Sequence, residues 1–107
     1  WAAQSEHPHW RTHIPMRLVV EFLGQARRLA QTRETVLHPE HGSSLRDVLR
    51  QLAVDYPALV GPVIVPQTFD IVPSYMLNID GRRTVRDLDA LPEDGQRLIL
   101  MFVEAGG

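Results

Sequence analysis

The sequence contains no cysteine, and all eleven of its basic Lys/Arg residues are arginine. Without cysteine, disulfides, thiolate metal sites and cysteine nucleophiles are excluded. The arginines are offset by 13 acidic residues, giving a net charge of -2, so the basic excess of nucleic-acid binders is missing. No apolar run approaches the ~20 residues of a membrane span. We therefore expect neither nucleic acid nor membrane as a partner, and the lack of disulfides fits a cytoplasmic location.

The length of 107 residues suits a single domain, but the first residues differ from the rest. Residues 1–15 carry three histidines (His7, His9 and His13) and show no periodicity. We interpret this segment as a flexible extension or an expression remnant. The alternative, a metal-binding arm, lacks a carboxylate or thiol at convincing spacing. We expect no metal site, and a folded domain over residues 16–107.

Two short apolar runs near the start predict a β-hairpin. Residues 17–22 and 34–37 are rich in branched and aromatic side chains, as strands are. Between them, residues 25–31 are long enough for one helical turn or for a simple connection. Because the two strands are close in sequence, we expect them to pair with each other.

A helix is predicted from Ser44 to Tyr56. Ser44 is a good N-cap, and Asp47 is placed to complete a capping box. Pro57 ends the helix, because the residue before a proline avoids helical angles. The apolar residues fall at offsets that form one stripe: Leu45, Val48, Leu49, Leu52, Ala53 and Tyr56.

The second half predicts three more strands. We expect strands at residues 75–79, 82–85 and 97–102, with a tight turn at Asp80-Gly81 and a single helical turn at residues 88–91. Residues 58–73 form an apolar, proline-containing loop, which either covers the core or forms a partner-facing patch. The resulting order is β-β-α-β-(β)-β, an α+β fold with a mixed sheet of four to five strands on one main helix. We expect the first and last strands to be parallel neighbours, which is the β-grasp arrangement.

This element order and the chain's ending resemble the MoaD/ThiS group of ubiquitin-like sulfur carriers, and most closely its MoaD-like members. The resemblance covers residues 17–107. The matching pieces are Phe22-Leu-Gly-Gln-Ala-Arg-Arg-Leu-Ala30, Ser44-Leu-Arg-Asp-Val-Leu-Arg-Gln-Leu52 with Tyr56-Pro57, Leu77-Asn-Ile-Asp-Gly81, the turn at residues 91–95, and Ala105-Gly106-Gly107.

The resemblance implies a function at the C-terminus. Gly107 would be adenylated by an E1-like enzyme using ATP and Mg²⁺, and a persulfide sulfur donor would convert the adenylate to a thiocarboxylate. Ala105 and Gly106 would form the tail, whose small residues can thread a narrow channel. The chain would present an acyl group without catalysing the reaction itself, and it would hold no permanent cofactor. The acceptor would be a larger synthase subunit or another protein.

Alternation along the last strand predicts the surface that binds these partners. If Leu98 and Leu100 face the helix, Ile99 and Met101 point to the opposite face of the sheet. With Phe102 they are the predicted partner-binding residues. The alternative is that the loop at residues 58–73 covers this face. The arginines at 82, 83 and 86 are interpreted as a solvated turn, with recognition of an acidic partner as the alternative.

Three functions remain open from the sequence. The length from Met16 favours the small subunit of molybdopterin synthase, in molybdenum cofactor biosynthesis. A second class is a ubiquitin-like protein modifier, or a carrier for thiamin, tRNA or amino-acid sulfur chemistry. Because the chain has no lysine, it cannot form chains with itself through lysine. A third class is a β-grasp binding module without tail chemistry.

Overall fold

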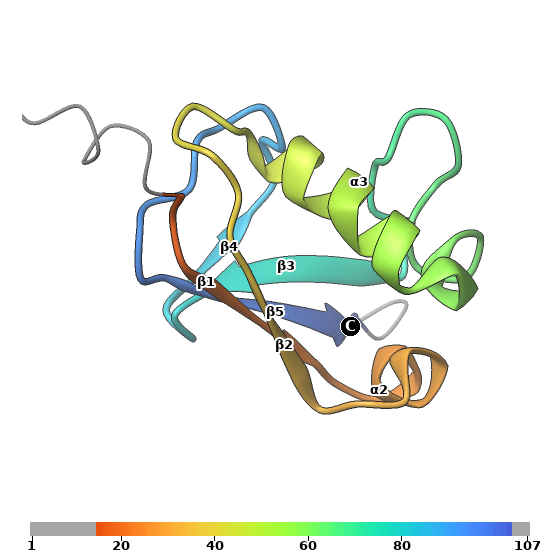
Figure 1. The fold of residues 1–107 in the computed structure, drawn as a ribbon. Coiled ribbons are helices and arrows are strands. Elements are labelled where there is room, and N and C mark those ends of the chain that lie inside the picture. Colours follow the sequence, from red (N-terminus) through yellow and green to blue (C-terminus); the bar gives the residue numbers. More distant parts are fainter. Residues whose placement is uncertain (1–14, 104–107) are drawn as a thin grey trace, which may run out of the picture.

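The structure is a computed structural model, and it describes residues 15–103. The predicted order of strands and main helix is confirmed (Figure 1). The elements are β1 (Leu18–Phe22), α2 (Gln25–Ala30), β2 (Glu34–Leu37), α3 (Leu45–Asp55), the 3-10 helix η2 (Pro57–Leu59), β3 (Tyr75–Ile79), β4 (Arg83–Val85) and β5 (Arg97–Phe102).

The five strands form one mixed sheet in the order β2-β1-β5-β3-β4. Strands β1 and β5 run parallel, with Val20 opposite Leu98, and the other neighbours are antiparallel. The prediction that the first and last strands are parallel neighbours is confirmed. A parallel pair needs a long crossover, and here the crossover carries α3 over one face of the sheet (Figure 1).

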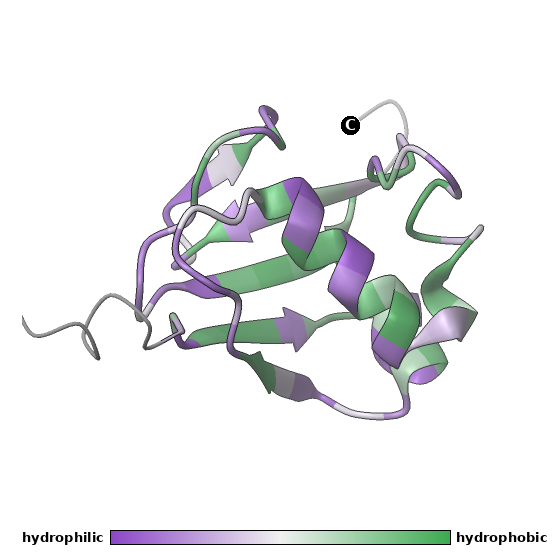
Figure 2. Cartoon of the chain, turned by 45° about the horizontal axis from the view of Figure 1, so that its top comes forward, coloured by the Kyte–Doolittle hydropathy of each residue, from purple (hydrophilic) through white to green (hydrophobic). Residues whose placement is uncertain are grey.

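Helix α3 begins with the predicted capping box. The Ser44 hydroxyl accepts a hydrogen bond from the Asp47 N–H at 3.1 Å, and the Asp47 carboxylate accepts one from the Ser44 N–H at 3.0 Å. Both bonds satisfy amides that the first helical turn leaves free. The apolar stripe faces the sheet, while polar residues colour the outer side of the helix (Figure 2).

The core lies between α3 and the sheet. Leu98 and Leu100 are 1% and 0% exposed, as the alternation predicts. The loop at residues 58–73 packs on this core, with Val63 and Ile64 fully buried. Of the two interpretations of this loop, the one in which it covers the core therefore fits its apolar residues. The largest fully buried side chains are Phe22, Leu18, Leu45, Leu49, Leu52, Leu59, Ile64, Leu77, Leu98 and Leu100.

The prediction of a helical turn at residues 88–91 is wrong. This segment is an irregular turn, because its carbonyl groups are used elsewhere. The Leu45 and Arg46 N–H groups at the start of α3 donate to the carbonyls of Ala90 and Leu88, at 3.0 and 2.8 Å. A helix at residues 88–91 would direct these carbonyls along its own axis. The segment thus completes the capping of α3.

Candidate functional site

The predicted tail follows the central strand of the sheet. Strand β5 is hydrogen-bonded to β1 on one side and to β3 on the other. Beyond its last residue, the Val103 N–H donates to the Ser74 carbonyl at 2.7 Å, which fixes the direction in which the chain leaves the sheet. The predicted site residues Ala105, Gly106 and Gly107 lie outside the described residues. The structure therefore describes the base of the tail.

Ile99 and Met101 lie on the face of the sheet opposite α3, here called the outer face. Both are half-buried. In register, Ile99 lies between Glu21 and Asn78, and Met101 lies beside Met76. These apolar side chains form a small patch at the middle of the sheet, close to the start of the tail. The apolar part of the loop at residues 58–73 packs with the core on the other side of the sheet.

Phe102 does not join this patch. It is in register with Tyr75, and the two rings meet edge to face with centroids 5.7 Å apart. Tyr75 is a core residue, so Phe102 points to the α3 side, as alternation requires. Its side chain is nevertheless 55% exposed, because it extends past the end of the core. The predicted trio is thus divided: two residues on the outer face, and one at the rim beside the tail.

An ionic cluster borders the outer-face patch, and sequence reasoning missed it. Arg97 Nη1 donates to Glu21 Oε1 and to Glu34 Oε1, both at 3.0 Å. These bonds, the one to Glu34 first, raise the pKa of the Arg97 guanidinium above its ordinary value. The three side chains are partly exposed, so the cluster adds little to stability. The cluster places charged groups beside an apolar patch. It could have been predicted by extending the alternation of side chains from β5 to β1 and β2.

Arg46 connects three segments that sequence reasoning did not place together. Its guanidinium forms ion pairs with Asp70 and with Asp89, and it donates to the Thr68 carbonyl at 2.9 Å. The bond from Arg46 is the first cause that lowers the pKa of the Asp70 carboxyl. These contacts tie the loop at residues 58–73 to α3. The arginines at 82, 83 and 86 are all exposed, in keeping with a solvated turn.

Two classes of site are not found between residues 15 and 103. No group of three or more His, Cys, Asp or Glu residues there could hold a metal ion. Among the helices of the same segment, none is long and apolar enough to cross a membrane. His7, His9 and His13, the alternative metal-binding arm, lie outside the described residues.

Comparison with known proteins gives a clear result at the level of structure. No family model and no curated protein matches the sequence. The structure of small archaeal modifier protein 1 from Haloferax volcanii superimposes with a TM-score of 0.72 at 18% identity, covering 85% of this chain and 99% of that one. The chain has the ubiquitin-like β-grasp fold. This confirms the predicted resemblance to the MoaD/ThiS group at the level of the fold.

Two further solved structures share the β-grasp fold. A putative molybdopterin converting factor, subunit 1, from Pyrococcus furiosus matches with a TM-score of 0.69 and 18% identity, over 83% of this chain and 99% of that one. CysO from Amycolatopsis orientalis, solved in complex with BexX, matches with a TM-score of 0.63 and 15% identity, over 84% and 99%. At such identities the likeness establishes the shared fold and nothing finer.

Proposed function

We propose that this β-grasp protein is a sulfur carrier whose C-terminal Gly107 is adenylated and then converted to a thiocarboxylate. The observation that carries the proposal is that the central strand of the sheet ends at Phe102, so that in the sequence only residues 103–105 separate it from the Gly106-Gly107 pair. Strand β5 is anchored on both sides, so an ending of small residues begins from a rigid base. Ala105, Gly106 and Gly107 add no bulky side chain, which suits entry into a narrow site.

The chemistry requires an activating partner. A carboxylate is a poor acyl donor because its oxygen is a bad leaving group. Attack of the Gly107 carboxylate on the α-phosphorus of ATP would release pyrophosphate and give an acyl-adenylate, with Mg²⁺ serving the activating enzyme. The terminal sulfur of the donor's persulfide would then attack the glycyl carbonyl and displace AMP, giving an acyl disulfide. A second thiol, supplied by a partner protein because this chain has no cysteine, would cleave its S–S bond, leaving the thiocarboxylate on Gly107 and a disulfide between that thiol and the donor. The carrier itself would supply neither acid nor base to these steps.

The favoured pathway is molybdenum cofactor biosynthesis, with the chain as small subunit of molybdopterin synthase. The fold shared with the putative molybdopterin converting factor subunit of Pyrococcus furiosus supports this choice. In this role the tail would enter the active site of a larger synthase subunit.

The proposed docking surface for these partners is the outer face around Ile99 and Met101. The patch is apolar, is bordered by the charged cluster of Arg97, and lies at the base of the tail. Apolar side chains within a polar border are typical of protein interfaces. Phe102, exposed at the rim, would contact the partner that surrounds the tail. The CysO–BexX complex offers a precedent for a β-grasp protein bound to a partner.

The test of the tail is intact-mass spectrometry of the full chain made in its native cell. We expect a fraction in which one oxygen is replaced by sulfur. Deletion of Gly106 and Gly107 should abolish this fraction while leaving the fold intact by circular dichroism. If the unmodified mass alone is found, and the deletion changes no cellular phenotype, the carrier proposal fails and a binding module without tail chemistry is favoured.

The test of the docking face is a pair of matched glutamate variants. Met101→Glu places a charge in the patch, whereas Val54→Glu places one on α3, where the side chain is 71% exposed. The thiocarboxylate fraction should fall about tenfold or more for Met101→Glu and stay unchanged for Val54→Glu. Equal effects of the two variants would rule out the outer face as the docking surface.

A second candidate is a ubiquitin-like protein modifier. It is favoured by the fold shared with small archaeal modifier protein 1. The same activated glycine would then be attacked by a lysine amine of a target protein, giving an isopeptide bond. The chain has no lysine of its own, so conjugates should carry single copies rather than lysine-linked chains. Species larger than the free chain in the mass experiment would identify this activity.

A further inference from the structure

Strand β2 leaves one side of its backbone open. It is an edge strand, paired with β1 alone. At the two ends of this pairing, the Phe22 N–H donates to the Arg33 carbonyl and the Met16 N–H to the Pro39 carbonyl. In an antiparallel pair, bonded residues alternate with unbonded ones. Val36 and His38 therefore direct their N–H and C=O groups away from β1, and they have no backbone partner within residues 15–103.

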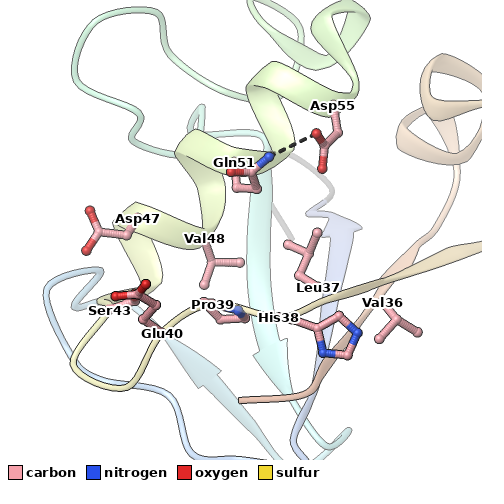
Figure 3. Close-up of a pocket in the computed structure, with 10 residues that line it drawn as sticks. All are labelled: Val36, Leu37, His38, Pro39, Glu40, Ser43, Asp47, Val48, Gln51 and Asp55. Atoms are coloured by element: carbon pink, nitrogen blue, oxygen red, sulfur yellow. Dashed lines mark hydrogen bonds between the residues drawn. The ribbon is translucent and has the colours of Figure 1, made fainter. Parts of the chain in front are cut away.

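This open edge borders a groove between β2 and α3 of about 440 Å³ (Figure 3). Leu37 from β2, Val48 from α3 and Pro39 supply its apolar surface. An extended segment in this position would continue the sheet through Val36 and His38. Its alternate side chains would enter the groove. The lining residues are Val36, Leu37, His38, Pro39, Glu40, Ser43, Asp47, Val48, Gln51 and Asp55.

The charged residues that line the groove are all acidic. Glu40, Asp47 and Asp55 contribute carboxylates, and no arginine is among the lining residues. Asp47 is partly neutralised by Arg50, at 3.1 Å, and Asp55 accepts a hydrogen bond from Gln51 at 2.9 Å. Glu40 is exposed, and its carboxylate pairs with no residue from 15 to 103. The groove therefore presents negative charge beside apolar surface and open backbone groups.

We propose that this groove binds an extended, basic peptide segment of another protein, which adds to β2 as a sixth strand. Main-chain bonds to Val36 and His38 would supply affinity, and alternate apolar side chains with flanking Lys or Arg would supply specificity. A second copy of this chain is disfavoured, because it would bring the same three carboxylates against these. Such an edge is otherwise a liability that proteins tend to block.

The groove is a site separate from the tail. Leu37 lies opposite Leu18, at the beginning of β1, and β5 runs parallel to β1. The groove therefore borders the sheet near the start of β5, whereas the tail leaves from its end. A peptide bound here would leave both the outer face and the tail free. The inference goes beyond the carrier function and does not depend on it.

The first test uses the full chain, labelled with ¹⁵N, and the synthetic peptide Lys-Arg-Val-Thr-Ile-Thr-Val-Arg-Lys. The control peptide has Glu in place of every Lys and Arg. We expect the basic peptide to shift the amide signals of Val36 and His38 and to slow their hydrogen exchange, with smaller shifts along α3. The acidic peptide should do neither. Shifts confined to other surfaces, or equal binding of the two peptides, would overturn the proposal.

The second test uses variants that separate backbone pairing from charge. Val36→Pro removes an outward N–H without removing a β1 bond, and Val36→Ala controls for the lost side chain. Binding should weaken about fivefold more for proline than for alanine. Glu40→Arg should weaken binding about three- to tenfold at low salt, an effect that disappears at high salt. The matched control, Glu93→Arg, alters an exposed residue that does not line the groove and should weaken binding less.

Hydrogen exchange of the free chain tests the other possible occupants. The Val36 and His38 amides should exchange rapidly when no peptide is present. Protection that is independent of protein concentration would place the chain's own residues 1–14 in the groove, and protection that rises with concentration would place a second copy there. Either result would overturn the proposal, as would wild-type peptide affinity in both Val36→Pro and Glu40→Arg.

Discussion

Leu100→Ala tests how the fold divides β5 between core and docking surface. Leu100 is 0% exposed and lies in register between Phe22 and Leu77, which are themselves buried. These neighbours belong to adjacent strands and cannot readily collapse into the space. Truncation should therefore cost about 3–5 kcal/mol, from lost transfer free energy and from the cavity. At about 4–8 °C per kcal/mol for a domain of this size, the melting temperature should fall by about 12–40 °C.

The assay is urea unfolding of the full chain followed by circular dichroism, with Met101→Ala as the matched variant. Met101 is adjacent in sequence but half-buried on the outer face. Its truncation should cost clearly less, about 1 kcal/mol, as the removed side chain is already partly in water. In both variants the midpoint should move without a change in slope. If Met101→Ala costs as much as Leu100→Ala, the outer face is not a free surface, and the reasoning is refuted.

Three further predictions concern local structure. Ser44→Ala removes one half of the capping box and should lower the free energy of unfolding by about 1 kcal/mol in urea titrations. The pKa of Asp70 is lowered in the folded state, mainly by the bond from Arg46. The contribution of Asp70 to stability is therefore full above its ordinary pKa of 3.8 and is lost as the pH falls below that value. In thermal unfolding measured at decreasing pH, the melting temperature of Asp70→Asn should therefore fall less than that of the wild type. Gly81 has a φ of +70° with open space around it, so Gly81→Ala should cost about 1 kcal/mol by thermal melting, from backbone strain alone.

Much of the fold could be predicted because local signals and the long-range arrangement agree. The stripe of α3 and the capping residues at Ser44 and Asp47 depend on neighbours in sequence, and each is found as predicted. The Asp80-Gly81 turn likewise depends on two residues, whose φ angles are +57° and +70°. Both angles are positive, as the tight turn of a hairpin requires. The parallel pairing of the first and last strands could be predicted because a helix joins the opening hairpin to the later strands.

What could not be predicted depends on distant partners. Residues 88–91 have a helical pattern, but the free amides of Leu45 and Arg46 take the Ala90 and Leu88 carbonyls. A periodic pattern in the sequence cannot indicate that these carbonyl groups accept hydrogen bonds from a distant segment. Strand alternation places Phe102 on the opposite face of the sheet from Ile99 and Met101, and the structure shows it there, beside Tyr75. Its exposure at the rim depends on where the core ends, which alternation does not indicate.

The arrangement of β5 explains why a sulfur carrier and a protein modifier can share one fold. In both proposed roles the reacting group would be the acyl group of Gly107, and the central strand would hold the base of the tail in the same way for either acceptor. The choice between sulfur donation and conjugation must then depend on which protein docks beside the tail. For this chain, that choice would involve the outer face around Ile99 and Met101, whereas the acidic groove beside β2 would remain free to bind the proposed basic peptide of a further protein. The pathway is accordingly to be sought in the surfaces rather than in the tail.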